Sequence, residues 1–313
     1  MPPPYPHLSV LCNEWIAALE QSYLKTYLDG TLGAGGHAEA VLEHHPEIQL
    51  LVGIDQDLSA LAISRERLSP WEGKLHFCHD NFKNLKHLLP NLPANRFDGM
   101  LFDIGVSSMQ FDQAERGFSF MHDGPLDMRM NREGFLTAEI IVNEWSFEEL
   151  GKILRNYGEE PLWRMIAKTI VKGREQQRIV STKQLSELLL PSFPYYVKKK
   201  SIHPLTLTFQ ALRIAVNEEL HSLTELIPAA IDALAPKGML GIISFHSLED
   251  RIVKNAFRYA ASDKETTSGI AGVFQDKQPI VKLLTTKPIT ASEEELALNP
   301  RSRSAKLRIV QKL

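Results

Sequence analysis

The sequence predicts an α/β protein, a doubly wound parallel sheet that is interrupted by a helical insertion. Two observations predict the sheet. Apolar runs that end on an acidic residue alternate with helical segments, and the first run leads into a glycine-rich turn, DGTLGAGGHA at 29–38. A third observation, the loss of strand signals between 107 and 214, predicts the insertion.

The composition is that of a globular protein. Of the 313 residues, 43% are hydrophobic and 23% are charged, enough to bury a sizeable core in one large or two ordinary domains. The sequence contains no apolar run of about 18 residues, the length that spans a bilayer, and the N-terminus lacks the features of a signal peptide. We therefore expect a cytoplasmic protein. Cys12 and Cys78 lie far apart in apolar surroundings, which favours a reducing compartment and no zinc site.

The glycine turn follows a short apolar strand that ends at Asp29. Glycine suits such a turn because it adopts positive φ and because a missing Cβ lets backbone N–H groups approach a ligand closely. The spacing of Gly33, Gly35 and Ala38 also fits the dinucleotide fingerprint. Glycine turns serve plain strand-to-helix corners too, so the turn needs support from elsewhere in the chain.

Asp55 provides that support. It ends a second buried-strand run, 50–54, about twenty residues after the turn. A carboxylate at the tip of the second strand is placed to accept both hydroxyls of a ribose. We therefore expect a cofactor that contains a ribose, and both nicotinamide cofactors and S-adenosylmethionine meet this requirement.

Two further strands continue the alternation. Residues 57–68 are expected to form a helix, 74–79 a third strand and 96–103 a fourth strand. Because the carboxyl ends of parallel strands share one edge of a sheet, we expect the acids that follow them to lie along that edge. These acids are Asp29, Asp55, Asp80 and Asp103.

Beyond the fourth strand the chain changes character. Residues 104–132 have little periodicity, which predicts a long ordered loop of the kind that is usually functional. Capping boxes at 146–149 and 181–184 then open helices. We predict that this helical domain, 107–214, is inserted into a discontinuous sheet domain, 1–106 and 215–313.

The sheet is expected to resume after the insertion. A helical segment at 208–234 precedes a strand at 238–245, and the segments 280–286 and 305–311 would add a final pair of strands. Ser244, His246 and Glu249 suggest a hydrolase triad, but no GxSxG motif surrounds the serine, and we interpret 247–250 as a helix cap.

Six segments along the chain stand out, and several of them are long and unusual: DGTLGAGGHA (29–38), LFDIGVSSMQFDQAERGFSFMHDGPLDMRM (101–130), YGEE (157–160), HPLTLTFQALRIAVNEEL (203–220), SFHSLEDRIVK (244–254) and NPRSRSAKLR (299–308). In this order they resemble the RsmH (MraW) family of bacterial methyltransferases, which methylate N4 of a cytidine in the decoding (P-site) region of 16S ribosomal RNA. The resemblance implies a class I methyltransferase fold, S-adenosylmethionine as methyl donor, an inserted domain that helps to hold RNA, and the small ribosomal subunit as partner. Whether the protein forms a homodimer stays open.

The resemblance also implies which residues bind the donor. Asp55 would bind the ribose, Phe82 would lie against the adenine unless it is only a core aromatic, and the glycines would admit the methionine end. His37 would either orient the carboxylate of the donor or cap the helix. The full set carried over is Gly35, Gly36, His37, Asp55, Phe82, Asp103 and Gln110.

The chain departs from the family pattern at two positions. Met109 stands where the family usually has proline, and Leu207 stands where it usually has a basic residue. The lysines at 198–200 could replace the phosphate contact that a basic residue would make there, although a short charge run is more often a solvated face. We expect better RNA contacts from the long loop, at Arg116, Arg129 and Arg132.

The implied reaction is a displacement by a poor nucleophile, since the lone pair of the cytosine amine is drawn into the ring. Alignment would supply most of the rate, and an acceptor for the amine N–H would supply the rest. We assign Asp103 as this catalytic acceptor, together with the backbone of Ile104 and Gly105. The target base must be unstacked, and aromatic residues that could stack on it, or merely pack in the core, are Phe118, Phe120 and Phe209.

Two other functions fit parts of the sequence. A nicotinamide-dependent oxidoreductase would share the glycine turn and Asp55 but would leave the long loop and the insertion without a purpose. A non-catalytic ribosome assembly factor could keep the fold and the RNA surface, but it would have no need of Asp103 or of an intact turn. The RNA methyltransferase uses every segment. We therefore expect S-adenosylmethionine as the only cofactor, with no metal.

Overall fold

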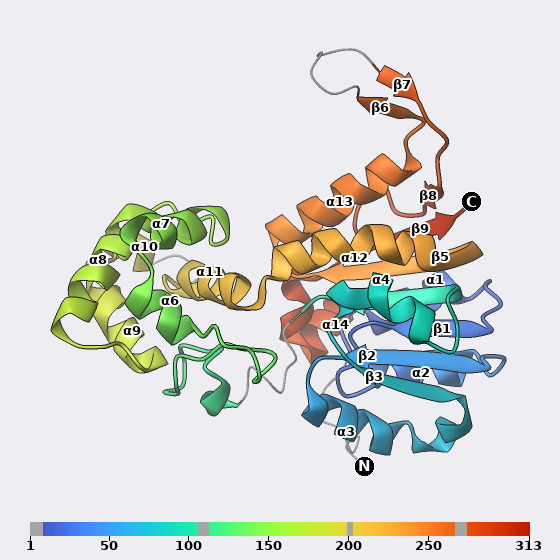
Figure 1. Cartoon of the computed structure of the whole chain (residues 1–313), viewed down its shortest axis with the longest axis horizontal. Coiled ribbons are helices and arrows are strands. Elements are labelled where there is room, and N and C mark those ends of the chain that lie inside the picture. The colour runs from blue at the N-terminus through green and yellow to red at the C-terminus, as the bar shows by residue number, and fades with distance from the viewer. Residues whose placement is uncertain (1–8, 106–112, 199–202, 267–273) are drawn as a thin grey trace. The chain divides into compact units, whose positions relative to one another are not determined.

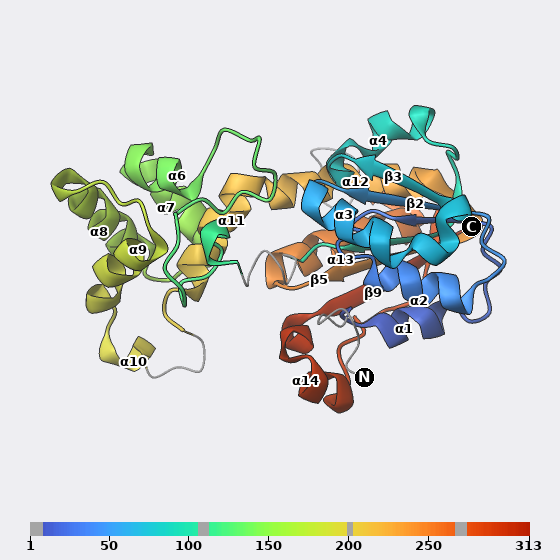
Figure 2. The ribbon, with the colours of Figure 1, turned by 90° about the horizontal axis from the view of Figure 1, so that it is seen from below.

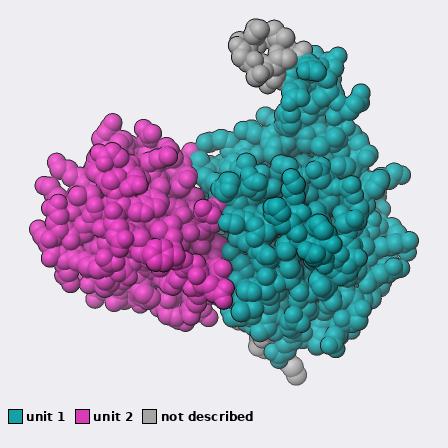
Figure 3. Space-filling model, in the orientation of Figure 1, with its two compact units in different colours: residues 1–105, 220–313 teal, residues 106–219 magenta. Residues whose placement is uncertain are grey.

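The computed structural model describes residues 9–105, 113–198, 203–266 and 274–313. The chain divides into two compact units, which Figure 3 shows in teal and magenta. Unit 1 comprises Met1–Gly105 and Leu220–Leu313, and unit 2 comprises Val106–Glu219. The insertion expected at 107–214 falls inside the range of unit 2.

Unit 1 is built on a seven-stranded sheet with the order β3-β2-β1-β4-β5-β9-β8 (Figure 1). The first five strands are parallel, and β9 is antiparallel to both of its neighbours. The strands are β1 (Thr26–Asp29), β2 (Leu50–Asp55), β3 (Leu75–His79), β4 (Phe97–Asp103), β5 (Leu234–Ser244), β8 (Val281–Leu283) and β9 (Lys306–Lys312).

The strand order reverses between β1 and β4. From β1 the chain proceeds outward through β2 and β3, and it then returns to the other side of β1 to form β4 and β5. Such a switch point opens a crevice outside the carboxyl ends of the two strands, where α/β proteins bind their ligands. The predicted doubly wound sheet is confirmed, as is the final strand pair.

Helices cover both faces of the sheet (Figures 1 and 2). One face packs against α4 (Leu85–Leu88), α12 (Glu219–Ala233) and α13 (Ser247–Ala261), and the other against α1 (Cys12–Leu19), α2 (Gly36–His44) and α3 (Leu58–Arg67). The strands are therefore buried on both sides, which explains why β2 and β4 are continuous apolar runs rather than alternating ones.

The helical segment expected at 208–234 is two helices. The first, α11 (Thr206–Asn217), ends at Glu218, whose φ of 50° is left-handed and breaks the hydrogen-bond ladder. The second helix is α12, and β5 follows it directly at Leu234. The prediction of one continuous helix is therefore wrong, because a single non-glycine residue in this conformation carries no local sequence signal.

Unit 2 is helical around its own apolar core. Its helices are α6 (Ala138–Glu144), α7 (Phe147–Asn156), α8 (Trp163–Gln176), α9 (Thr182–Leu189), α10 (Tyr195–Lys198) and α11. Both predicted capping boxes are present, at Ser146 with Glu149 and at Ser181 with Gln184. Between 113 and 137 the described chain is an ordered loop with one short 3-10 turn, Ala114–Arg116.

Two smaller elements complete unit 1. Strands β6 (Lys264–Thr266) and β7 (Phe274–Asp276) pair as an antiparallel ribbon, and α14 (Glu293–Leu298) precedes β9. Within the described ranges no helix combines the length and the apolar character that a membrane span requires.

Candidate functional site

The glycine turn joins β1 to α2 at the switch point. Gly33 and Gly35 have φ values of 54° and 80°, a left-handed conformation that other residues adopt only at a cost. Gly35 is the N-cap of α2. A Cβ at Gly36 would instead closely approach the Ser9 hydroxyl oxygen.

Asp55 fixes the shape of this turn. Its Oδ2 accepts the N–H of Gly33 at 2.7 Å, and its Oδ1 accepts the N–H of Asp57 at 2.8 Å. A carboxylate oxygen can accept more than one hydrogen bond, so both oxygens retain capacity for the hydroxyls of a ribose. Burial raises the pKa of Asp55. One residue thus ties the second strand to the turn, and its contact with a ribose stays a prediction.

Phe82 lies just beyond β3. It begins the 3-10 turn Phe82–Asn84, which Asn81 caps, and the Asp80 N–H anchors the segment by donating to the Asp55 carbonyl at 3.1 Å. The Phe82 ring meets the Phe102 ring edge-on, with centroids 6.2 Å apart, and it is only partly buried. A ring that is partly exposed at the carboxyl edge of the sheet could lie against an adenine. This contact between Phe82 and adenine stays a prediction.

Asp29 and Asp103 end the two strands that flank the switch point. Asp29 is 1% exposed; its Oδ1 accepts the Thr31 N–H at 3.1 Å, whereas its Oδ2 is buried with no hydrogen-bond partner among the described residues. Asp103 accepts the Gly105 N–H at 3.2 Å, and its own N–H donates to the Thr31 hydroxyl at 2.6 Å. Thr31 therefore connects the two strand ends.

The carboxyl edge of the sheet carries acidic side chains that have no cation beside them among the described residues. The pKa of Asp29 is raised to about 6, because burial and the negative charges of Asp103 and Asp55 outweigh the opposing effects of His37 and the Thr31 N–H. Burial also raises the pKa of Asp103, again opposed by His37. Within the described chain, no lysine or arginine lies within ion-pair distance of Asp29, Asp55 or Asp103. A ligand that brings positive charge would therefore fit this edge.

His37 is buried on α2 and has a partner of its own. Its Nε2 lies 2.9 Å from the Val10 carbonyl, which can only accept, so Nε2 carries the proton. Gly35 holds the N-cap position, so the structure excludes one of the two alternatives, that His37 caps the helix. A contact between His37 and the donor stays a prediction, and it would have to use Nδ1.

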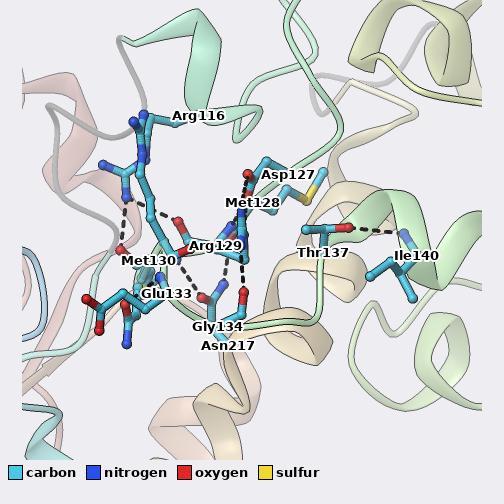
Figure 4. Close-up of polar contacts among 12 residues, drawn as sticks. Arg116, Asp127, Met128, Arg129, Met130, Glu133, Gly134, Thr137, Ile140 and Asn217 are labelled. Carbon is cyan, nitrogen blue, oxygen red and sulfur yellow. Dashed lines mark hydrogen bonds and ion pairs between the residues drawn. The ribbon is translucent and has the colours of Figure 1, made fainter.

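Gln110 lies outside the described residues. The neighbouring part of the loop, however, shows two of the expected RNA-binding arginines in detail (Figure 4). Arg116 is 5% exposed and donates to the carbonyls of Arg129 and Met130 at 3.1 and 3.0 Å. Arg129 binds both carboxylate oxygens of Asp127, at 2.8 and 2.7 Å.

These contacts assign both arginines to the fold of the loop. The expectation that Arg116 faces RNA is wrong, because a guanidinium that is this deeply buried bonds the chain itself. Arg129 also donates to the carbonyls of Arg132 and Gly134, so these donors are used within the loop. Arg132 is exposed.

Of the aromatic residues expected to stack on a base, Phe118 and Phe209 are each 4% exposed and belong to the core of unit 2. Phe120 packs edge-on against Phe209 with centroids 5.2 Å apart, and it stacks on His203 with centroids 4.5 Å apart. The packing interpretation therefore holds for Phe118 and Phe209.

Two residues at the end of β5 have roles that the sequence motifs did not reveal. His246, not Ser247, is the N-cap of α13, with Glu249 as its capping-box partner. Glu249 is fully buried, and its Oε2 accepts the N–H of Phe245 at 2.8 Å. Ser244 donates instead to the Lys306 carbonyl at 3.5 Å, so these residues form no hydrolase triad.

Nucleotide-binding α/β folds differ in the charge that their glycine turn faces. Here the turn lies beside carboxylates that no cation of the described chain balances, which suits a positively charged donor better than a pyrophosphate. That places the fold among the class I S-adenosylmethionine-dependent methyltransferases.

Sequence comparison identifies the family. The chain belongs to the MraW methylase family, whose model matches residues 4–313. It is 56% identical to the ribosomal RNA small subunit methyltransferase H of Protochlamydia amoebophila (strain UWE25), over 100% of this chain and 99% of the relative. The proteins of the same name from Heliobacterium mobile and Clostridioides difficile (strain 630) are 46% and 43% identical, each over 98% of this chain and 99% of the relative.

Proposed function

We propose that this protein transfers the methyl group of S-adenosylmethionine to N4 of a cytidine in the decoding region of 16S ribosomal RNA. The observation that carries the choice of donor is the buried Oδ2 of Asp29, which has no hydrogen-bond partner in the described chain. A buried carboxylate oxygen without a partner is costly unless a ligand satisfies it. The small-subunit RNA substrate follows from the names of the relatives.

Charge separates the two candidate cofactors. S-adenosylmethionine carries a sulfonium and an ammonium group, and both would relieve the repulsion among Asp29, Asp55 and Asp103. A nicotinamide dinucleotide would instead bring the negative pyrophosphate to an edge where burial and mutual repulsion already raise the pKa of Asp29. The acids around the glycine turn therefore disfavour the oxidoreductase alternative.

Each part of the donor would meet a described group. The ribose hydroxyls would bind Asp55, the adenine would lie on Phe82, and the methionine end would enter past Gly35 and Gly36. The ammonium group suits Asp29. When bound, the donor supplies a methyl group on a positively charged sulfur, and Gln110 is carried over only by the family resemblance.

Asp103 would act on the nucleophile. Its carboxylate stands at the end of β4, and the Gly105 N–H holds Oδ1 in place at 3.2 Å. By accepting an N–H of the cytosine amine, the carboxylate aligns the nitrogen and increases its electron density. A nearby positive charge lowers a carboxyl pKa, so Asp103 would be ionised when it is needed. As the bond from nitrogen to the methyl group forms, the bond from sulfur to the methyl group breaks and leaves a neutral thioether; the amine proton would then pass to the Asp103 carboxylate and on to water.

The test is to incubate the protein with labelled S-adenosylmethionine and small ribosomal subunits from cells that lack the enzyme, and then to separate the nucleosides. We expect label in N4-methylcytidine. Label in a different nucleoside would overturn the substrate. Binding of the subunit and of the donor without any label would favour the assembly-factor alternative.

Three finer points belong to the same proposal. The substrate would be the assembled small subunit rather than free RNA, and comparing the two in the labelling assay tests this. The site of action would be the cytoplasm, where such subunits form. A homodimer is a further expectation, and sedimentation of the purified protein tests it.

A further inference from the structure

Trp163 lies at the junction of two helices in unit 2. Gly151 of α7 gives the indole room, because a Cβ at that position would lie 2.6 Å from the ring. The Phe147 ring lies on the same indole, with centroids 6.4 Å apart. Two guanidinium groups meet the ring, Arg155 of α7 at 5.8 Å and Arg164 of α8 at 4.4 Å from the centroid. Both arginines are exposed.

More cations extend this pair along both helices. Arg164, Lys168 and Lys172 are spaced four residues apart on α8, so they share one face and follow each other by about 6 Å along the axis. Lys152 lies one turn before Arg155 on α7. All are exposed, and we call Lys152, Arg155, Arg164, Lys168, Lys172 and Trp163 the α7–α8 basic surface.

Carboxylates do not neutralise this surface. Throughout the described chain, no Asp or Glu lies within ion-pair distance of any of its lysines or arginines. Glu148 and Glu175 are exposed on the same helices without pairing to them. Arg155 donates a hydrogen bond only to a neutral group, the neighbouring Asn156 amide oxygen at 3.3 Å, as far as the described residues extend.

Other arginines of unit 2 behave differently. Arg178 pairs with Glu139 at 2.8 Å and Glu144 at 3.3 Å, and Arg174 donates to the carbonyls of Val142 and Trp145 at 2.9 and 2.6 Å. The unit therefore has carboxylates and carbonyls with which to satisfy its arginines. On the α7–α8 basic surface it keeps like charges together instead, and this raises the local positive potential.

We propose that the α7–α8 basic surface binds the phosphate backbone of the RNA substrate. The inference rests on the proposed function, which it deepens by naming the residues that hold the substrate away from the reacting base. Guanidinium groups suit phosphate oxygens because their planar donors bind two oxygens at once, and the indole holds Arg155 and Arg164 in place. A chain with net charge -3 needs such a local patch to attract RNA.

The test is the salt dependence of binding to small ribosomal subunits from cells that lack the enzyme. We expect the Arg155→Ala/Arg164→Ala variant to reduce the slope of log K against log salt by about 1.4 to 1.8 units, as the removal of two phosphate contacts requires. The KM for subunits should rise about tenfold or more, with kcat and the affinity for S-adenosylmethionine unchanged.

Arg178→Ala is the matched control. This arginine is 53% exposed in the same unit but ion-paired, so its removal should leave the slope unchanged. Lys168→Gln/Lys172→Gln gives a second, independent variant with no aromatic contact to remove, and it should reduce the slope similarly. If both double variants keep the wild-type slope, the surface does not bind phosphates. If wild-type protein neither binds nor methylates subunits, the proposed function itself fails.

Discussion

The carboxylates at the ends of β1, β2 and β4 and the charged residues Arg116, Asp127 and Arg129 of the loop 113–137 are all at least partly buried, but they are balanced in opposite ways. In the loop, Asp127 faces Arg129, and Arg116 donates to backbone carbonyls. At the strand ends, Asp29 and Asp103 face other acids and a single histidine.

The pKa values show the consequence. Burial alone would raise the pKa of Asp127, but hydrogen bonds from Arg129 and the charges of Arg129 and Arg116 outweigh it, so this pKa is lowered. At Asp29 burial prevails, and the pKa rises to about 6. The charges of the loop are balanced within the chain, and they stabilise its fold. Charges left unbalanced at a buried edge reduce stability, which is the expected cost of a site built for a positively charged ligand.

The largest effect should come from Asp103. Asp103→Asn keeps the shape of the side chain but removes the charge that accepts the amine N–H. We expect kcat to fall about 10²- to 10³-fold, the usual loss for one preorganised electrostatic contact, while donor binding changes only a few-fold. Labelling of small subunits measures the first quantity and calorimetry the second. Asp232→Asn, an exposed carboxylate on α12, is the control and should leave both unchanged.

A loss of stability is expected in the loop. Arg116→Met would leave the buried carbonyls of Arg129 and Met130 without this donor, and we expect a cost of about 2–3 kcal/mol, confined to unit 2. Hydrogen exchange resolved by peptide would show it as faster exchange between 113 and 145. If both units lost protection from hydrogen exchange equally, the expectation that the effect is confined to unit 2 would be contradicted.

Asp29→Asn should have the opposite effect on the fold. In the native protein the Asp29 pKa is raised to about 6, so its ionisation costs stability as pH rises from about 4 to 6. The variant lacks this cost and should be more stable at pH 7 by about 1–2 kcal/mol without donor. It should also bind S-adenosylmethionine roughly 10- to 100-fold more weakly, the loss of one charged hydrogen bond. Thermal melts at pH 4 and pH 7 check the expectation about stability. A difference in melting temperature between variant and wild type that is the same at both pH values would contradict it.

The smallest effect should be at Phe82. Phe82→Leu keeps an apolar contact with Phe102 but removes the flat face offered to adenine. We expect the affinity for the donor to fall about 3- to 10-fold, corresponding to roughly 0.5–1.5 kcal/mol for an aromatic pair. A variant that loses stability but no affinity would show that Phe82 is only a core residue.

Predictions from the sequence succeeded where local pattern and sheet geometry agree. Acids that follow buried runs had to meet at one edge, because parallel strands end together, and Asp29, Asp55 and Asp103 do so in the observed register. Capping boxes are equally local, and those at Ser146 and Ser181 are where they were expected.

Predictions failed where a side chain chooses among distant partners. Arg116 looked like a surface cation, but its acceptors lie thirteen and fourteen residues along the loop. For His37, a helix cap was one of two alternatives, but its Nε2 bonds the carbonyl of Val10, which precedes α1. The true cap of α13, His246, was overlooked because serine, the commoner cap, follows it. The roles of the donor-site residues stay predictions until a donor is bound.

The most direct test of the unbalanced edge is the proton released when S-adenosylmethionine binds, measured by calorimetry in two buffers of different ionisation enthalpy. With a pKa of about 6, Asp29 is about half protonated at pH 6 and must lose that proton to receive a cation. Wild-type protein should release about half a proton more than Asp29→Asn at pH 6, with the difference fading at pH 7. Equal release from the two proteins at pH 6 would contradict the claim that Asp29 is kept unbalanced for the donor.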